Sequence, residues 1–180
     1  MSRDITFSRL FEHISKQERP LVIVETGTIR NEGDGDGHST VGFSLLARND
    51  KDIEFYTIDN NSECIELSKK IIEKHCGSIP ENVHFIESDG DKFLESFDKK
   101  IDILYLDSAN SADITLDEYI SSKHLLKDTS IVMIDDADRN DTNLNKWKKV
   151  VPQMQEDGWE IDAWVYQVIL KKSKKENNDE

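Results

Sequence analysis

The residues best suited to chemistry in this 180-residue chain are carboxylates that follow short apolar runs. Each of five such runs is followed by an acid, and the last is followed by two. The acids are Glu25, Asp59, Asp89, Asp107, Asp135 and Asp136. Carboxylates accept hydrogen bonds from sugar hydroxyls, and grouped carboxylates bind hard divalent cations. The sequence therefore predicts a polar site, provided that the fold brings these acids together.

The elements that must position the acids can be identified from hydrophobic periodicity. Short β-branched runs indicate buried strands, and patterns with helical spacing lie between them. The expected strands are residues 22–24, 53–58, 83–86, 101–106 and 130–134, and the expected helices are 39–48, 62–76, 91–97, 116–126 and 143–156. This alternation predicts parallel strands with right-handed crossovers and helices on both faces. The carboxyl ends of the five strands then lie along the edge where open α/β sheets bind ligands.

The two ends of the chain complete the expected fold. Residues 1–20 carry an approximate helical stripe, which predicts a helix against the sheet or over its binding edge. Residues 159–170 leave no room for a helix between two strands, so we expect a hairpin that adds an antiparallel strand. The fold class is therefore α/β, a Rossmann-like, doubly wound, mostly parallel seven-stranded sheet in a single domain over residues 1–170. We expect residues 171–180 to be a disordered charged tail.

Composition limits the class of function. The chain is 36% hydrophobic and 33% charged, with a formal net charge of −14. This acidic balance argues against a general binder of nucleic acid or of membrane surfaces, and no apolar run reaches the roughly 18 residues of a membrane span. Residues 1–20 lack the apolar region of a signal peptide. Cys64 and Cys76 lack metal-ligand spacing, so we expect reduced thiols in a cytoplasmic protein.

The segment between the first strand and the next helix reads ETGTIRNEGDGDGHST, at residues 25–40. Its first four residues allow a sharp turn after the strand, and Ser39 or Thr40 can cap the helix that follows. Residues 29–37 are too polar to bury apolar surface, so we expect a mobile lid that orders over cofactor or substrate. His38 is either a solvated loop residue or a pocket residue that acts as a base near neutral pH.

The ETGT turn, the acids after the second, third and fourth strands and the terminal hairpin resemble the class I S-adenosylmethionine-dependent methyltransferases over residues 21–170. The resemblance implies that the methionine part of the cofactor lies at Glu25, Thr26, Gly27 and Thr28. It also implies that Asp59 binds the ribose and that Ser88 and Asp89 bind the adenine, with Ser39, Asn60 and Gly90 as further contacts. Asp107 matches the position near the transferred methyl group. The chain departs from the family where IRNEGDGDG displaces the later glycine of the first motif.

The segments YLDSAN and MIDDAD look like the two metal-binding segments of small metal-dependent O-methyltransferases of the catechol-type and sugar-modifying kinds. This likeness implies that Asp107, Asp135 and Asp136 hold a divalent cation, most simply Mg²⁺, which binds a hydroxyl of a small-molecule acceptor. Catechol-type enzymes carry a lysine base shortly after the first of these acids, but residues 108–110 here are Ser-Ala-Asn. The base is then Asp107, His38 or a metal-bound water, and the sequence does not choose among them.

Two other interpretations remain. Residues 35–40 nearly form a dinucleotide fingerprint with Asp59 at a suitable distance, as in an NAD-dependent enzyme, but Thr40 replaces the last glycine. A P-loop would need a lysine where His38 stands. A non-catalytic Rossmann-fold partner subunit would not need both Asp59 and the acids after the later strands, and this chain has both. The sequence leaves the identity of the acceptor and a homodimeric assembly open.

Overall fold

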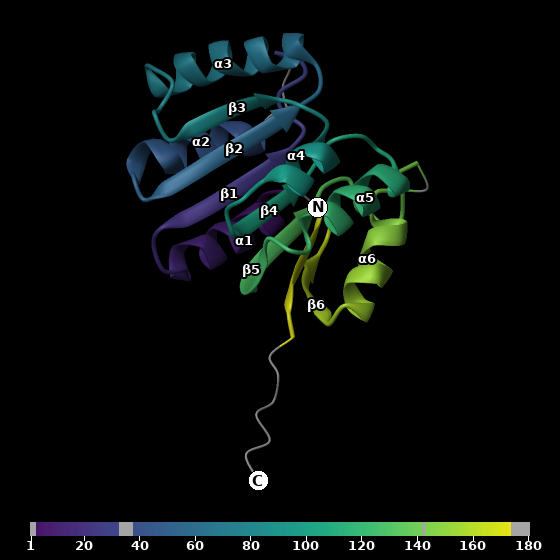
Figure 1. Ribbon diagram of the computed structural model, residues 1–180. Coiled ribbons are helices and arrows are strands. Elements are labelled where there is room, and N and C mark those ends of the chain that lie inside the picture. Colours follow the sequence, from purple (N-terminus) through teal and green to yellow (C-terminus); the bar gives the residue numbers. More distant parts are fainter. Residues whose placement is uncertain (1–2, 33–37, 142, 174–180) are drawn as a thin grey trace.

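The computed structural model describes residues 3–32, 38–141 and 143–173. One sheet holds seven strands: β1 (Leu21–Thr26), β2 (Ile53–Asp59), β3 (Val83–Glu87), β4 (Ile101–Leu106), β5 (Leu126–Ile134), β6 (Trp159–Trp164) and β7 (Val168–Lys172). Their order is β3-β2-β1-β4-β5-β7-β6 (Figure 1). The first five are parallel to their neighbours among them, and β7 lies antiparallel to both β5 and β6. The predicted Rossmann-like fold with a C-terminal antiparallel hairpin is confirmed.

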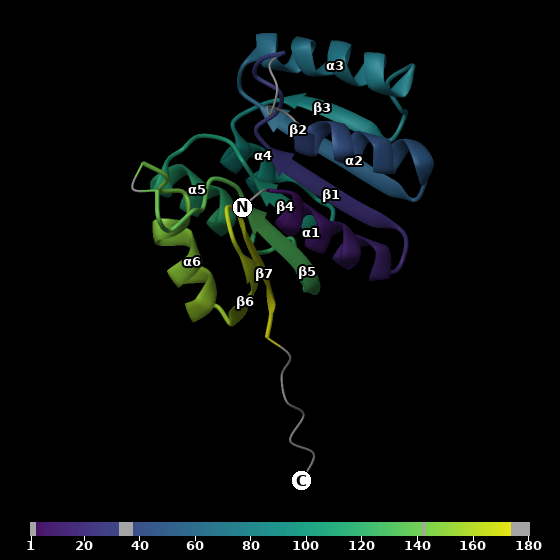
Figure 2. The ribbon, with the colours of Figure 1, turned by 180° about the vertical axis from the view of Figure 1, so that it is seen from behind.

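Helices cover both faces of the sheet, as predicted. They are α1 (Asp4–Lys16), α2 (His38–Asn49), α3 (Ser62–Cys76), α4 (Gly90–Ser96), α5 (Ala112–Ser122) and α6 (Trp147–Glu156). Figure 1 shows α4, α5 and α6 in front of the sheet, and the reverse view in Figure 2 shows α1 and α2 on the other face. None of the described helices is long and apolar enough to span a bilayer.

The apolar run of β1 explains why this strand lies near the centre of the sheet. Leu21 and Ile23 pack into the core under α1 and α2, and Val24 packs into the core under α4, α5 and α6. Successive strand residues point to opposite faces, so a strand covered on both sides needs apolar residues at consecutive positions.

The boundary between α5 and β5 differs from the prediction. We expected the helix to reach residue 126, but α5 ends at Ser122, and β5 begins at Leu126. Ser130 stabilises an irregularity in the pairing with β4, because its hydroxyl accepts from the amide of Lys127 at 2.7 Å and donates to the carbonyl of Ile101 at 2.6 Å. A serine hydroxyl that takes the place of backbone hydrogen bonds between strands leaves no periodic pattern in the sequence.

The C-terminal strand is longer than expected. Lys171 and Lys172 belong to β7, where Lys171 pairs with Glu160 of β6, so these two residues are not part of a tail. Residues 174–180, the rest of the expected tail, lie outside the described residues.

Backbone hydrogen bonds continue past the carboxyl ends of the central strands. The amide of Gly27 donates to the carbonyl of Ile58 at 2.7 Å, and the amide of Asp107 donates to that of Thr26 at 2.9 Å. In the same way, the amide of Asp135, after β5, donates to the carbonyl of Leu106 in β4 at 3.1 Å. The acids after the strands therefore start from fixed backbone positions along one edge of the sheet.

Candidate active site at the carboxyl edge of the sheet

A cavity of about 520 Å³ opens at the carboxyl ends of β1, β2 and β3, within the size range of small-ligand sites. Seven of the predicted cofactor-binding residues line it: Thr26, Gly27, Asp59, Asn60, Ser88, Asp89 and Gly90. Ile58 and Ile114 add apolar surface, and Arg30 and Lys92 add positive charge. The cavity thus joins hydrogen-bonding groups to apolar walls, as a nucleoside requires.

Gly27 brings two loops together at the mouth of this cavity. Its φ is +86°, and a Cβ there would lie 2.3 Å from the carbonyl oxygen of Asp107. Only glycine allows both the left-handed conformation and this approach to a backbone atom. The turn after β1 is consequently pressed against the loop after β4.

The carboxylate of Asp59 is fixed by two backbone amides at the cavity wall. Its Oδ2 accepts from the amide of Thr28 at 3.2 Å, and its Oδ1 accepts from the amide of Asn61 at 2.9 Å. Each carboxylate oxygen can accept a further hydrogen bond, so Asp59 keeps acceptor capacity for ligand hydroxyls.

Asp89 is oriented by its neighbours. Its side chain pairs with Lys92 and accepts from the amide Nδ2 of Asn60 at 3.1 Å. The ion pair with Lys92, followed by the bond from Asn60, holds the pKa of Asp89 below its usual value. Asp89 is therefore an ionised acceptor at the rim of the cavity.

Glu25 lies beneath the cavity rather than in its lining. Its side chain is buried, and its Oε2 accepts from the hydroxyls of Thr40 and Thr57, each at 2.8 Å. Burial raises the pKa of Glu25 to about 7, although the hydroxyls of Ser39, Thr40 and Thr57 lower it. The expectation that Ser39 or Thr40 caps the helix is wrong: α2 already begins at His38, and both residues are buried in its first turn.

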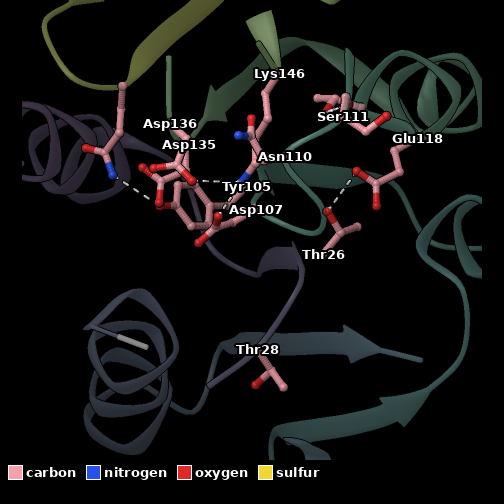
Figure 3. Close-up of polar contacts among 12 residues, drawn as sticks. Thr26, Thr28, Tyr105, Asp107, Asn110, Ser111, Glu118, Asp135, Asp136 and Lys146 are labelled. Atoms are coloured by element: carbon pink, nitrogen blue, oxygen red, sulfur yellow. Dashed lines mark hydrogen bonds and ion pairs between the residues drawn. The ribbon is translucent and has the colours of Figure 1, made fainter. Parts of the chain in front are cut away.

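Two further predicted residues lie away from the cavity. Thr28 turns toward α3, where its hydroxyl shares a 2.8 Å hydrogen bond with that of Ser68, and Figure 3 shows it apart from the carboxylates. His38 is exposed at the first residue of α2 and is not among the residues that line the cavity. Its role as a base stays a prediction.

The predicted lid is anchored at its start. Ile29 is 1% exposed, and its amide donates to the hydroxyl of Ser68 at 3.1 Å. Residues 33–37, which carry the glycines of this insert, lie outside the described residues. The expected mobility therefore does not apply to the first residue of the insert.

The three acids predicted to bind metal do come together. Asp107, Asp135 and Asp136, named here the carboxylate triad, each offer an oxygen within 4.8 Å of the others (Figure 3). Asp135 is buried, and its Oδ1 has no hydrogen-bond partner within the described part of the chain. Burial and the charge of Asp135 raise the pKa of Asp107 well above its usual value. The triad thus concentrates negative charge that needs a cation.

Two cations of the chain itself contact the triad. The ammonium of Lys146 lies 2.6 Å from Oδ1 of Asp107 and 3.4 Å from Oδ2 of Asp136, and its side chain is 1% exposed. The guanidinium of Arg3 lies 2.9 Å from Oδ1 of Asp136 and 3.3 Å from Oδ2 of Asp135. The sequence predicted neither residue, because one lies in a polar stretch and the other near the N-terminus, with no local signal.

Asn110 places Lys146 over the triad. Its Nδ2 donates to the carbonyl of Asn143 at 2.9 Å, and its Oδ1 accepts from the amide of Asn145 at 3.2 Å. The loop before α6 is thereby tied to the loop after β4. At this site a lysine reaches Asp107 from a distant segment, although residues 108–110 contain none.

Glu118 of α5 is a further residue that the sequence did not reveal. It is 1% exposed, lines the cavity, and its Oε2 accepts from the hydroxyl of Thr26 at 3.1 Å (Figure 3). Burial raises its pKa to about 7. A Cβ at Gly90 would lie 2.3 Å from its Oε1, so the glycine makes room for this carboxyl group.

A doubly wound sheet with a cavity and converging carboxylates at its carboxyl edge defines the Rossmann-like class of α/β proteins, in which ligands bind at this edge. A family model described as a methyltransferase domain matches residues 32–137, more than half of the chain. The chain therefore belongs to the methyltransferase domain family. No curated protein matches this sequence significantly.

Solved structures share the fold at low sequence identity. The calicheamicin methyltransferase CalS11 is 14% identical, with a TM-score of 0.67 over 93% of this chain and 77% of that one. SMU.1697c from Streptococcus mutans, solved in complex with SAH, is 14% identical, with a TM-score of 0.65 over 96% and 99%. Precorrin 8w decarboxylase from Methanobacterium thermoautotrophicum is 15% identical, with a TM-score of 0.63 over 94% and 89%. These structures establish the fold of S-adenosylmethionine-dependent methyltransferases, and the fold alone does not identify the acceptor.

Proposed function

We propose that the protein transfers the methyl group of S-adenosylmethionine to a hydroxyl group of a small molecule, with a sugar as the first candidate. The observation that carries this proposal is the contact at Gly27, which joins the cavity to the loop that bears Asp107. A cofactor in the cavity would then have its reactive end beside the carboxylate triad. Among the neighbours in fold, CalS11 is described as a TDP-rhamnose 3′-O-methyltransferase, which supports a sugar acceptor.

The cavity supplies a partner for each part of the cofactor. Asp59 would accept hydrogen bonds from the ribose hydroxyls, and the ionised Asp89 would accept one from the adenine amino group. Thr26 and Gly27, at the end of β1, would lie under the methionine part. The family membership of the chain supports this assignment.

The triad would bind the acceptor through a divalent cation. Clustered carboxylate oxygens, one of them buried without a partner, suit a hard ion such as Mg²⁺. When bound, the ion would lower the pKa of the acceptor hydroxyl and hold its oxygen in place. Asp107, Asp135 and Asp136 would be its ligands.

The transfer itself requires no redox partner. The acceptor oxygen forms a bond to the methyl carbon while the carbon–sulfur bond breaks, and the electron pair of that bond stays on sulfur. The hydroxyl proton would pass to a base, for which Asp107 would serve through a carboxylate oxygen that does not hold the ion. His38, one of the two other predicted bases, is exposed and does not line the cavity.

Calorimetry with S-adenosylhomocysteine, the demethylated product, tests cofactor binding. We expect Asp59→Ala to weaken binding by about ten-fold or more, because a charged hydrogen bond contributes about 1.5–3 kcal/mol. Asp52→Ala is the matched control, since Asp52 is exposed just before β2, at the other end of that strand. Binding of NADH with no response to S-adenosylhomocysteine would refute the proposal and favour a dehydrogenase.

A further inference from the structure

The carboxylate triad is already partly neutralised from within the chain. Arg3 contacts Oδ2 of Asp135 and Oδ1 of Asp136. The oxygens left for another cation are then Oδ1 of Asp135, Oδ2 of Asp136 and those of Asp107. Lys146 faces two of these three residues, at 2.6 Å from Oδ1 of Asp107 and 3.4 Å from Oδ2 of Asp136. A metal ion held by all three acids would therefore compete with the lysine for Oδ2 of Asp136, because Arg3 and Tyr166 already contact Oδ1 of that residue.

Binding of both cations to these carboxylates at once would be electrostatically unfavourable. Mg²⁺ binds carboxylate oxygens at about 2.0–2.1 Å. An ion at that distance from Asp107 and Asp136 would lie close to the ammonium of Lys146, and like charges repel strongly where water is excluded. Lys146 is 1% exposed in its present position, so its charge is not screened by solvent there.

We propose that Lys146 is the internal counter-ion of the carboxylate triad and that a divalent cation must displace it to bind. This inference rests on the proposed function for its metal ion, but it concerns the chain's own lysine. Asn110 holds the segment before Lys146 through Asn143 and Asn145, so it stabilises the metal-free arrangement. Loss of either Lys146 or this clamp favours the metal.

The test is calorimetric titration of Mn²⁺ into the wild-type protein and variants. We expect Lys146→Met to bind Mn²⁺ roughly ten-fold more tightly or better, because the triad loses the competing charge. Asn110→Ala retains the lysine and should tighten binding by a smaller factor. Lys149→Met is the control, since Lys149 is exposed and pairs with the exposed Asp113. Its affinity should equal that of the wild type.

Each outcome decides the proposal. Equal or weaker Mn²⁺ binding by Lys146→Met overturns it, and if that variant does not fold, an unchanged affinity of Asn110→Ala overturns it instead. Absence of Mn²⁺ binding in every variant also overturns it. Titration of S-adenosylhomocysteine into the same samples separates this failure from that of the proposed cofactor site, because Asp59 and Asp89 line the cavity and the three acids of the triad do not.

Discussion

The buried carboxyl group of Glu118 makes the stability of the folded protein depend on pH. In the folded chain its pKa is about 7, because it is buried, whereas an unfolded glutamate titrates near about 4.3. The folded state therefore binds the proton more tightly than the unfolded state. The contribution of Glu118 to the free energy of unfolding is therefore complete below the pKa of the unfolded state, and it is lost as pH rises toward 7.

Substitution of Glu118 by glutamine should remove the loss of stability that accompanies ionisation of this carboxyl group. The free energy of unfolding of Glu118→Gln should rise relative to that of the wild type between about pH 4.5 and 7, by up to about 3 kcal/mol. Urea unfolding at a series of pH values measures the difference. Asp117→Asn, at an exposed neighbouring position, should follow the wild-type curve. Parallel curves for Glu118→Gln and the wild type would contradict the raised pKa.

Gly27 and Gly77 separate two effects of glycine. Both have a positive φ, +86° and +78°, but a Cβ at Gly27 would meet the carbonyl of Asp107, while one at Gly77 would meet nothing within 4 Å. We expect Gly77→Ala to cost about 1 kcal/mol in unfolding free energy and Gly27→Ala to cost several times more, because backbone atoms must move. Chemical denaturation of both variants measures these losses of unfolding free energy. Equal losses would show that the loop after β4 moves away from the added Cβ without a large energetic penalty.

Among the elements, α1 depends on one acid of the C-terminal hairpin. Asp162 of β6 is nearly buried and accepts from Arg9 at 2.7 Å and from His13 at 2.8 Å, both on α1. Lys171 of β7 also lies 3.1 Å from it. These bonds hold the pKa of Asp162 well below its usual value, with Arg9 the largest cause.

Asp162→Ala should therefore loosen α1. We expect a loss of about 1–3 kcal/mol in unfolding free energy, since the bonds are charged but the partners on α1 are partly exposed. Hydrogen exchange of the α1 amides should speed up more than that of the central strands. Glu160→Gln, at the exposed Glu160 of the same strand, is the control. Unchanged exchange in α1 would mean that the packing of Phe7 on Tyr105 and of Phe11 on Phe43 is enough to hold the helix.

The sequence predicts elements well where their boundaries are set locally. The bounds expected for α3 and β4 agree with the structure, and α3 has a local cause at each end: Asn61 accepts from the amide of Glu63, and Gly77 takes the left-handed conformation. The end of α5 was misplaced because Ser130 fixes the start of β5 through a contact with β4. Such long-range contacts are not visible in a local window.

The same distinction holds for the candidate site. Acids that follow parallel strands share an edge of the sheet whatever the side-chain packing, so their common edge could be predicted from the order of the elements. The choice of the triad among them came from the likeness of YLDSAN and MIDDAD to metal-binding segments. Lys146 and Glu118 reach the site from helices or their ends, and their burial depends on how α5 and α6 pack on the sheet. Polar residues in helical patterns normally face solvent, so the sequence assigned them no role.

At the scale of the whole molecule, the net charge of −14 sets the response to salt. Repulsion among the excess acids destabilises the compact state, and exposed ion pairs compensate little because each contributes only about 0–1 kcal/mol. We expect added NaCl to raise the melting temperature as it screens this repulsion. Scanning calorimetry at increasing NaCl measures this, with neutral sucrose of equal osmolality as the reference. A fall in melting temperature with salt would mean that specific ion pairs dominate.

The meeting of α1 with the C-terminal hairpin also has a consequence for biosynthesis. Thr6 hydrogen-bonds to Gln167, 161 residues further along, and the hydroxyl of Tyr166 donates to Asp136, which Arg3 also contacts. A ribosome delivers the first of these residues long before the last. Until the hairpin leaves the exit tunnel, the nascent chain holds Asp136 without Tyr166 and α1 without its partners. The edge of the sheet that carries the carboxylate triad is therefore completed only after the hairpin has been synthesised.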